Sequence, residues 1–232
     1  MLFRNTRIAL FASLLTLALA GCQPEGDSLS RGEALYARCA YCHMADGSGN
    51  PELAAPAIAG MEAWFVEGEL HEFRAGGRGG HYKDAGGMRM RPVAMTLRTN
   101  EEVKDVAAYV ASMPKVHPPA LLTGGNASTG KIKYAPCSTC HGQNGEGMNT
   151  DARKIPALAG QNDWYLKTQL HNFNSKIRGA DYEEGTDEWM MANVWINTLR
   201  QPGKDELDEQ AVLDVLADER REELGGGRRT NS

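Results

Sequence analysis

The sequence has no long apolar run and no excess of positive charge. Its N-terminal apolar stretch, Ile8 to Ala20, is shorter than the roughly 20 residues that span a bilayer. Its 30 acidic residues outnumber its 25 lysines and arginines, and the net charge of −5 argues against a nucleic-acid partner. A hydrophobic content of 41% and a charged content of 24% exclude a polytopic membrane protein and a largely disordered chain. The 232 residues are therefore expected to fold in water, as two small domains.

The apolar N-terminus is typical of a secretory signal peptide, because Arg4 and Arg7 precede it and small residues follow. The segment from Leu19 to Cys22 is similar to the bacterial lipobox, which is cleaved before its cysteine. We expect residues 1–21 to be removed and Cys22 to carry lipid, which places the protein on the periplasmic side of a bacterial membrane. An ordinary signal peptide that happens to precede a cysteine is the alternative, and it also implies export.

Disulfide bonds are not expected, because the remaining four cysteines form two C-x-x-C-H motifs. The motifs comprise Cys39, Cys42 and His43 in the first half of the chain and Cys137, Cys140 and His141 in the second. Two thiols at this spacing can add to the two vinyl groups on one edge of a haem, and the histidine then lies under the iron. The motifs predict two covalently bound haem c groups, each held by two cysteines and ligated by one histidine.

Two other interpretations of the motifs are weaker. A thioredoxin-like redox pair would explain neither the histidine in both motifs nor the lack of a strand before them. A structural zinc ion takes four ligands, whereas each motif supplies three and has no further cysteine or paired histidine nearby.

The chain contains an internal duplication. Residues after the motifs match at a constant offset of 100, and residues before them match at an offset of 98. The matches pair Gly32 with Gly130, Tyr36 with Tyr134, Pro56 with Pro156, Trp64 with Trp164, Leu70 to Phe73 with Leu170 to Phe173, Arg78 with Arg178 and Tyr82 with Tyr182. We expect a tether over residues 22–29, domain 1 over 30–114, a linker over 115–124, domain 2 over 125–220 and a disordered tail over 221–232.

The apolar spacing predicts helices, and strand-like alternation is weak throughout. Between Val103 and Met113 the apolar residues share one helix face, and Asn100 is a plausible helix start. The glycine-rich stretches 75–80 and 86–87 are typical of loops, and the prolines at 118–119 favour an extended linker.

The two C-x-x-C-H motifs and the internal duplication make the chain resemble the class I cytochromes c, specifically the tandem di-haem c-four type. The resemblance covers roughly residues 30–114 and 125–217. The resemblance implies an all-α fold of two domains, each a small helical bundle wrapped around one covalent haem. In that family an N-terminal helix with a glycine and an aromatic residue crosses a C-terminal helix with an aromatic residue. Gly32, Tyr36 and Tyr109 fit domain 1, and Gly130 and Tyr134 fit domain 2. Domain 2 departs from the pattern because Asp218 stands where the last aromatic residue is expected.

The resemblance also implies a methionine as the second iron ligand. We expect Met90 in domain 1 and Met190 in domain 2, since the repeat aligns them; the alternatives are Met88 and Met95 in domain 1 and Met191 in domain 2. A thioether opposite a histidine favours ferrous iron and raises the reduction potential.

Three further pairs of repeated residues carry hypotheses. The carbonyls of Pro56 and Pro156 are expected to accept the Nδ1 proton of the iron-ligating histidines, as in the family. Arg78 and Arg178 are candidates to pair with haem propionates, the alternative being exposed loop arginines. His71 and His171 are not expected to bind iron, because they lie on the side of a helix opposite its apolar face.

These observations predict an electron carrier and not an enzyme. It would pass single electrons between membrane respiratory complexes, such as a quinol-oxidising complex and a terminal oxidase or reductase, and it would need no small-molecule substrate. The alternatives are a di-haem redox enzyme of the peroxidase or thiosulfate dehydrogenase type, which needs an open or unusually ligated iron, and a cytochrome subunit of a larger dehydrogenase or oxidase complex.

Overall fold

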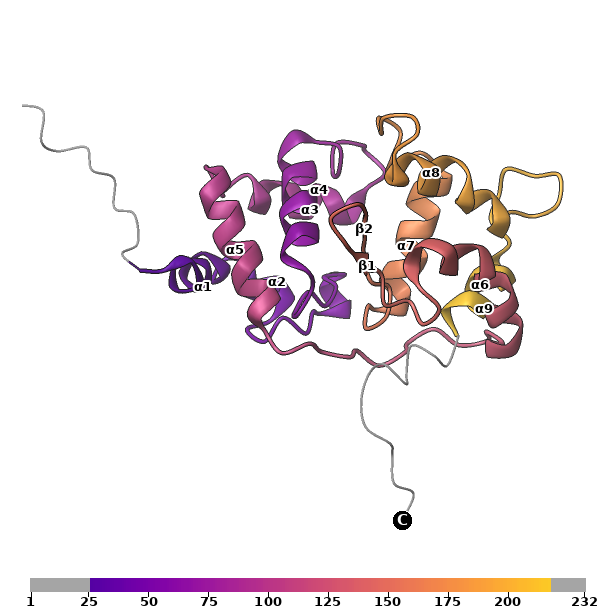
Figure 1. The fold of residues 1–232 in the computed structure, drawn as a ribbon, viewed down its shortest axis with the longest axis horizontal. Helices are drawn as coiled ribbons and strands as arrows, with labels where there is room; N and C mark the ends of the chain where they lie inside the picture. Colours follow the sequence, from indigo (N-terminus) through magenta and orange to yellow (C-terminus); the bar gives the residue numbers. More distant parts are fainter. Residues whose placement is uncertain (1–25, 218–232) are drawn as a thin grey trace, which may run out of the picture.

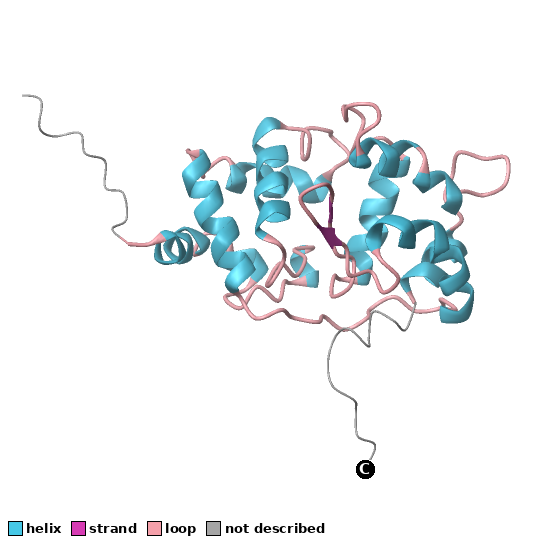
Figure 2. Ribbon diagram, in the orientation of Figure 1, coloured by secondary structure: helices cyan, strands magenta, loops and turns pink. Residues whose placement is uncertain are grey.

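The computed structural model describes residues 26–217 and shows two helical domains that follow each other along the chain (Figure 1). The predicted all-α class is confirmed, since the strands in this range form a single short hairpin (Figure 2). The signal segment 1–21, Cys22, Asp218 and the tail 221–232 lie outside the described residues. Within residues 26–217, no helix combines the length and the apolar character needed to cross a membrane.

Domain 1 is built from five α-helices and one short 3₁₀-helix. They are α1 (Ser28–Tyr36), α2 (Ala40–His43), η1 (Pro51–Leu53), α3 (Ala63–Ala75), α4 (Ala85–Ala94) and α5 (Asn100–Ser112). Helix α5 begins with a capping box, in which Thr99 and Glu102 satisfy each other's backbone N–H groups. Its buried face, which includes Val103, Val106 and Val110, belongs to the core of the domain, as the apolar spacing predicts.

Helices α1 and α5 cross at Gly32. A side-chain carbon at this position would overlap the carbonyl oxygen of Asp105, so only glycine allows the two backbones to approach this closely. Beside the crossing, the rings of Tyr36 and Tyr109 pack with their centroids 5.4 Å apart. The glycine and the two aromatic residues therefore meet as the sequence predicts.

Domain 2 repeats this arrangement with some differences. Its elements are α6 (Ala127–His141), β1 (Met148–Asn149), β2 (Lys154–Ile155), α7 (Asp163–Asn174), α8 (Asp187–Asn193), η2 (Trp195–Leu199) and α9 (Glu209–Leu216). Helix α6 spans the region that α1 and α2 cover in domain 1, and Gly130 brings it against the backbone of α9 at Asp214. The hairpin was not expected, because strands of two residues are too short to show alternation.

One predicted loop is wrong. Gly86 and Gly87 lie in the first turn of α4, where the side chain of Asp84 accepts the N–H of Gly87 at 2.9 Å. The same carboxylate accepts the N–H of Gly79 at 3.0 Å, and this glycine packs against the backbone of Gly87. The glycines allow a loop to lie directly on the helix, and the cap compensates for their low helix propensity.

The segment between the domains is extended, without helix or strand from residue 114 to 123. The carboxylate of Asp163 accepts the N–H groups of Leu121 and Leu122 at 2.8 and 2.7 Å, which ties the end of this segment to the start of α7.

Candidate haem sites

The two motifs lie on helical turns that start each site. In domain 1, Cys39 immediately precedes α2, which carries Cys42 and His43; in domain 2 the whole motif forms the end of α6. All four motif cysteines are free thiols. Burial raises the pKa of Cys39 and of Cys137 to about 11, so both are neutral thiols at physiological pH. The four sulfur atoms are thus available for thioether bonds to a haem.

The histidines of the motifs are oriented in the same way. His43 Nδ1 lies 2.8 Å from the carbonyl oxygen of Pro56, and His141 Nδ1 lies 2.9 Å from that of Pro156. Because a carbonyl can only accept, Nδ1 carries the proton and Nε2 keeps its lone pair for a metal. Burial lowers the pKa of both histidines in spite of these bonds, so the rings are neutral. The predicted hydrogen bonds to the prolyl carbonyls are confirmed.

A repeated tyrosine fixes the residue that follows each histidine. The hydroxyl of Tyr36 donates to the carbonyl of Met44 at 2.9 Å, and that of Tyr134 donates to the carbonyl of Gly142 at 3.0 Å. The two tyrosines therefore support the motif turns in addition to packing in the helix crossings.

The three candidate methionines of domain 1 differ in burial. Met90, on α4, is partly buried against the core, whereas Met88 and Met95 are 49% and 55% exposed. In domain 2, Met190 and Met191 are both partly buried on α8, so burial does not separate them.

Four buried side-chain N–H groups have no acceptor among the described residues: Trp64 Nε1, Trp164 Nε1, Arg78 Nε and Arg91 Nε. A buried donor without a partner costs about 1–3 kcal/mol, so four such donors indicate acceptors supplied by a bound group. Haem propionates are acceptors of this kind, and the donor set fits them. The sequence pairs Trp64 with Trp164 across the repeat but gives no sign that their N–H groups are buried without a partner.

Arg78 and Arg178 are not exposed loop residues. Their side chains are 6% and 11% exposed, and both bind the carboxylate of Glu69 on α3. The oxygen of Gln169, which matches Glu69 in the repeat, accepts from Arg178 at 2.9 Å and from Arg78 at 3.3 Å. The two arginines therefore form one cluster that joins the domains, and their pairing with propionates stays a prediction.

His71 on α3 and His171 on α7 each lie beside a carboxylate. His71 Nε2 is 3.8 Å from Glu67, and His171 Nε2 is 2.9 Å from Glu209 on α9. Both histidines are more than one-third exposed.

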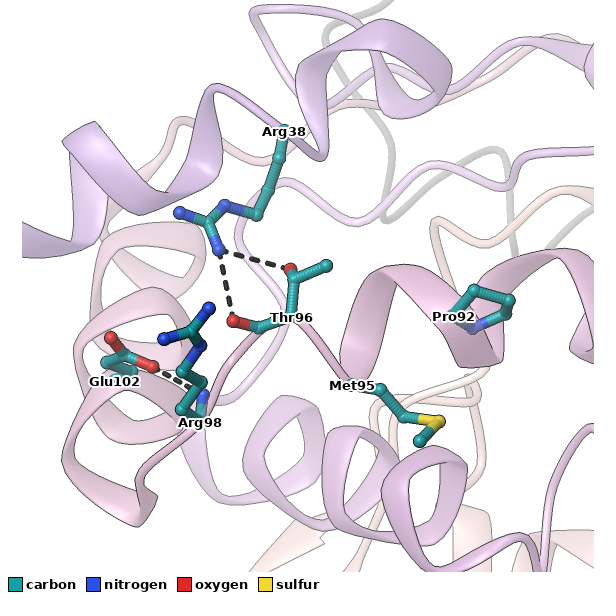
Figure 3. Close-up of a pocket in the computed structure, with 6 residues that line it drawn as sticks. All are labelled: Arg38, Pro92, Met95, Thr96, Arg98 and Glu102. Atoms are coloured by element: carbon teal, nitrogen blue, oxygen red, sulfur yellow. Dashed lines mark hydrogen bonds between the residues drawn. The ribbon is translucent and has the colours of Figure 1, made fainter.

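A surface hollow of about 500 Å³ lies beside the domain 1 motif (Figure 3). It is lined by Arg38, Pro92, Met95, Thr96, Arg98 and Glu102. Arg38, the residue before Cys39, donates to the carbonyl and the hydroxyl oxygen of Thr96 at 3.2 and 3.1 Å. These bonds link the motif to the chain that follows α4, the helix of Met90.

Comparison with known proteins decides the family. The cytochrome c family model matches residues 29–114 and, a second time, residues 127–217. The chain belongs to the cytochrome c family. It is 30% identical over 179 residues to cytochrome c4 of Pseudomonas aeruginosa, covering 74% of this chain and 84% of that protein. It is 29% identical over 197 residues to the thiosulfate dehydrogenase electron acceptor of Stutzerimonas stutzeri, covering 81% of each.

The fold agrees with this assignment. The structure of reduced cytochrome c4 from Pseudomonas stutzeri superposes with a TM-score of 0.58 at 22% identity, covering 82% of this chain and 95% of that one. As a tandem cytochrome c, this protein carries two covalent haem c groups and transfers electrons. The predicted family, cofactor and general function are thereby confirmed.

Proposed function

We propose that this cytochrome is a lipid-anchored carrier of single electrons between redox proteins of a membrane respiratory chain, and that it catalyses no reaction of its own. The likeness of the two sites is the observation that carries the proposal. In each, a prolyl carbonyl holds the histidine, and a partly buried methionine lies on the helix α4 or α8. An iron with a protein ligand on both faces exchanges electrons but has no position left for a substrate.

The site residues have the following roles. Cys39, Cys42, Cys137 and Cys140 would form the thioether bonds. His43 and His141 would each ligate an iron, and Met90 and Met190 would supply the second protein ligands. The haem supplies one-electron redox chemistry, while the protein orients the imidazoles and excludes water from them. The histidine–methionine pair favours the ferrous state and gives a high potential suited to accepting electrons.

The partners are other redox proteins. The relative from Stutzerimonas stutzeri is named as an electron acceptor of thiosulfate dehydrogenase, which supports a role downstream of a dehydrogenase or a quinol-oxidising complex. Removal of residues 1–21 and lipidation of Cys22 would keep the carrier at the periplasmic face of the membrane, beside such partners.

The purified mature protein tests this proposal. Its mass should show two haems, and its electron paramagnetic resonance spectrum should show low-spin ferric iron at both sites. It should exchange electrons rapidly with redox proteins and show no turnover with peroxide or thiosulfate. A high-spin haem together with turnover of either compound would assign the protein to the enzymes instead.

A further inference from the structure

Asn162 occupies the N-cap position of α7, yet its side chain makes no capping bond. An asparagine at this position normally accepts a backbone N–H from the first turn of its own helix. Here the side-chain oxygen instead accepts the N–H of Ala57 in domain 1, at 2.8 Å. Asn162 is only 3% exposed and this bond is buried, so its side chain is committed to the contact between the domains.

The peptide group that receives this bond also holds the histidine of domain 1. The N–H of Ala57 and the carbonyl of Pro56 belong to the same peptide unit, and this carbonyl accepts from His43 Nδ1 at 2.8 Å. Hydrogen bonds in series polarise one another, so an acceptor on the N–H end makes the carbonyl oxygen a stronger acceptor. Asn162 is therefore connected to His43 through one polarisable group.

The connection runs in one direction only. Position 62, which matches Asn162 in the repeat, holds Glu62, and within residues 26–217 no side chain of domain 1 bonds to the N–H of Ala157. Domain 2 thus contacts the peptide that holds the histidine of domain 1, without an equivalent contact in return.

We propose that Asn162 is a positioning residue by which domain 2 lowers the reduction potential of the haem in domain 1. The proposal rests on the ligation of iron by His43 proposed above. A stronger acceptor at Nδ1 makes the imidazole a better electron donor, which stabilises ferric iron. Loss of the Asn162 bond makes the carbonyl of Pro56 a weaker acceptor. The reduction potential of the haem in domain 1 should therefore rise, and that of the haem in domain 2 should not change.

The test variant is Asn162→Ser in the full-length holoprotein. A serine can cap α7, which preserves the helix, but it is too short to reach Ala57. Redox titration should show an upward shift in one of the two haem potentials. In nuclear magnetic resonance spectra of the reduced protein, the Nδ1 proton of His43 should move to lower chemical shift, as expected for a weaker hydrogen bond, while that of His141 should not move.

Gln161→Ala is the matched control. The side chain of Gln161 also bonds across the domains, but it donates to the carbonyl of Ala57 at 3.1 Å, which belongs to the next peptide unit. Its oxygen accepts the backbone N–H of Asn162 at 2.8 Å, so the control also measures the effect of a small change at the Asn162 backbone with the side-chain bond to Ala57 still available. Its loss should leave both potentials and both proton shifts unchanged. Equal shifts from the two variants, or no shift from Asn162→Ser, would overturn the proposal. A high-spin ferric haem in domain 1 of the unaltered protein would instead refute the proposed ligation of that iron, on which this inference rests.

Discussion

Met90 is the methionine that we propose as the second iron ligand in domain 1. Replacing it with alanine should abolish the low-spin histidine–methionine signature of one haem and lower its potential, because a thioether ligand is lost. Absorption spectra and redox titration of the purified variant would measure both effects. Met95→Ala, at an exposed position, should leave spectrum and potential unchanged; the reverse result would move the ligand to Met95.

Single residues differ in how far the sequence reveals their roles. Cys39, Cys42 and His43 are predictable because the chemistry of attachment requires a fixed local spacing. Asn162 is not, because its role depends on Ala57, 105 positions away in the sequence. Glu69 escapes prediction for the same reason, since nothing in the sequence around it indicates two arginine partners.

At the scale of elements, the crossing of α1 and α5 brings two helix backbones into direct contact at Gly32. Gly32→Ala should reduce the free energy of unfolding by roughly 1–3 kcal/mol, because the added carbon overlaps the backbone of α5 at Asp105. Denaturant unfolding monitored by circular dichroism would measure the loss.

Gly68 provides the control for this variant. It lies inside α3, and a side-chain carbon there would have no atom within 4 Å. Gly68→Ala should therefore be neutral or stabilise the protein by up to about 1 kcal/mol, through helix propensity alone. A similar loss from both alanines would contradict the packing argument.

The predictability of the elements follows from their amphipathicity. Helix α5 is predictable because its apolar residues recur at helical spacing and end on one buried face. Helix α4 is less predictable, because its two glycines are typical of a loop. The Asp84 cap that stabilises them also contacts Gly79, and this contact exists only in the folded protein.

For the whole molecule, the cluster around Glu69 is a main contact between the domains. Glu69→Gln would make the two repeats identical at this position and remove the protein carboxylate that two buried guanidinium groups share. The free energy of unfolding should fall by on the order of 3 kcal/mol. Glu67→Gln on the same helix removes only a partly exposed contact with His71, so it should cost less than about 1 kcal/mol. Equal losses from the two variants would rule out the special role of Glu69.

The same cluster predicts an acid dependence of stability. Burial raises the pKa of Glu69, but the guanidinium groups of Arg178 and Arg78 lower it more, so the pKa lies below its ordinary value of 4.5. A lowered pKa in the folded state means that the contribution of Glu69 is complete above pH 4.5 and is lost as the pH falls below that value. Unfolding measured across this range should show a smaller loss in Glu69→Gln than in the unaltered protein. Identical pH profiles would contradict this assignment.

The location of the molecule is tested at Cys22. Cys22→Ala should block processing or release the cytochrome into the soluble periplasmic fraction with both haems in place. The reason is that the acyl chains on Cys22 would supply the membrane affinity, at about 0.8 kcal/mol per buried methylene. Fractionation and mass spectrometry of the mature N-terminus would decide. A wild-type protein that is soluble and carries no lipid would identify a freely diffusing carrier.

The bonds from Gln161 and Asn162 to Ala57 can form only when both domains are present. An exported chain crosses the membrane N-terminus first, and until domain 2 arrives the N–H and the carbonyl of Ala57 lack these two partners. They obtain their protein partners after residue 162 has been made and domain 2 has folded against them. Domain 1 therefore completes the hydrogen bonds of Ala57 only in the presence of domain 2. A gene cut at the linker would encode two proteins, of which the first would lack part of its finished structure.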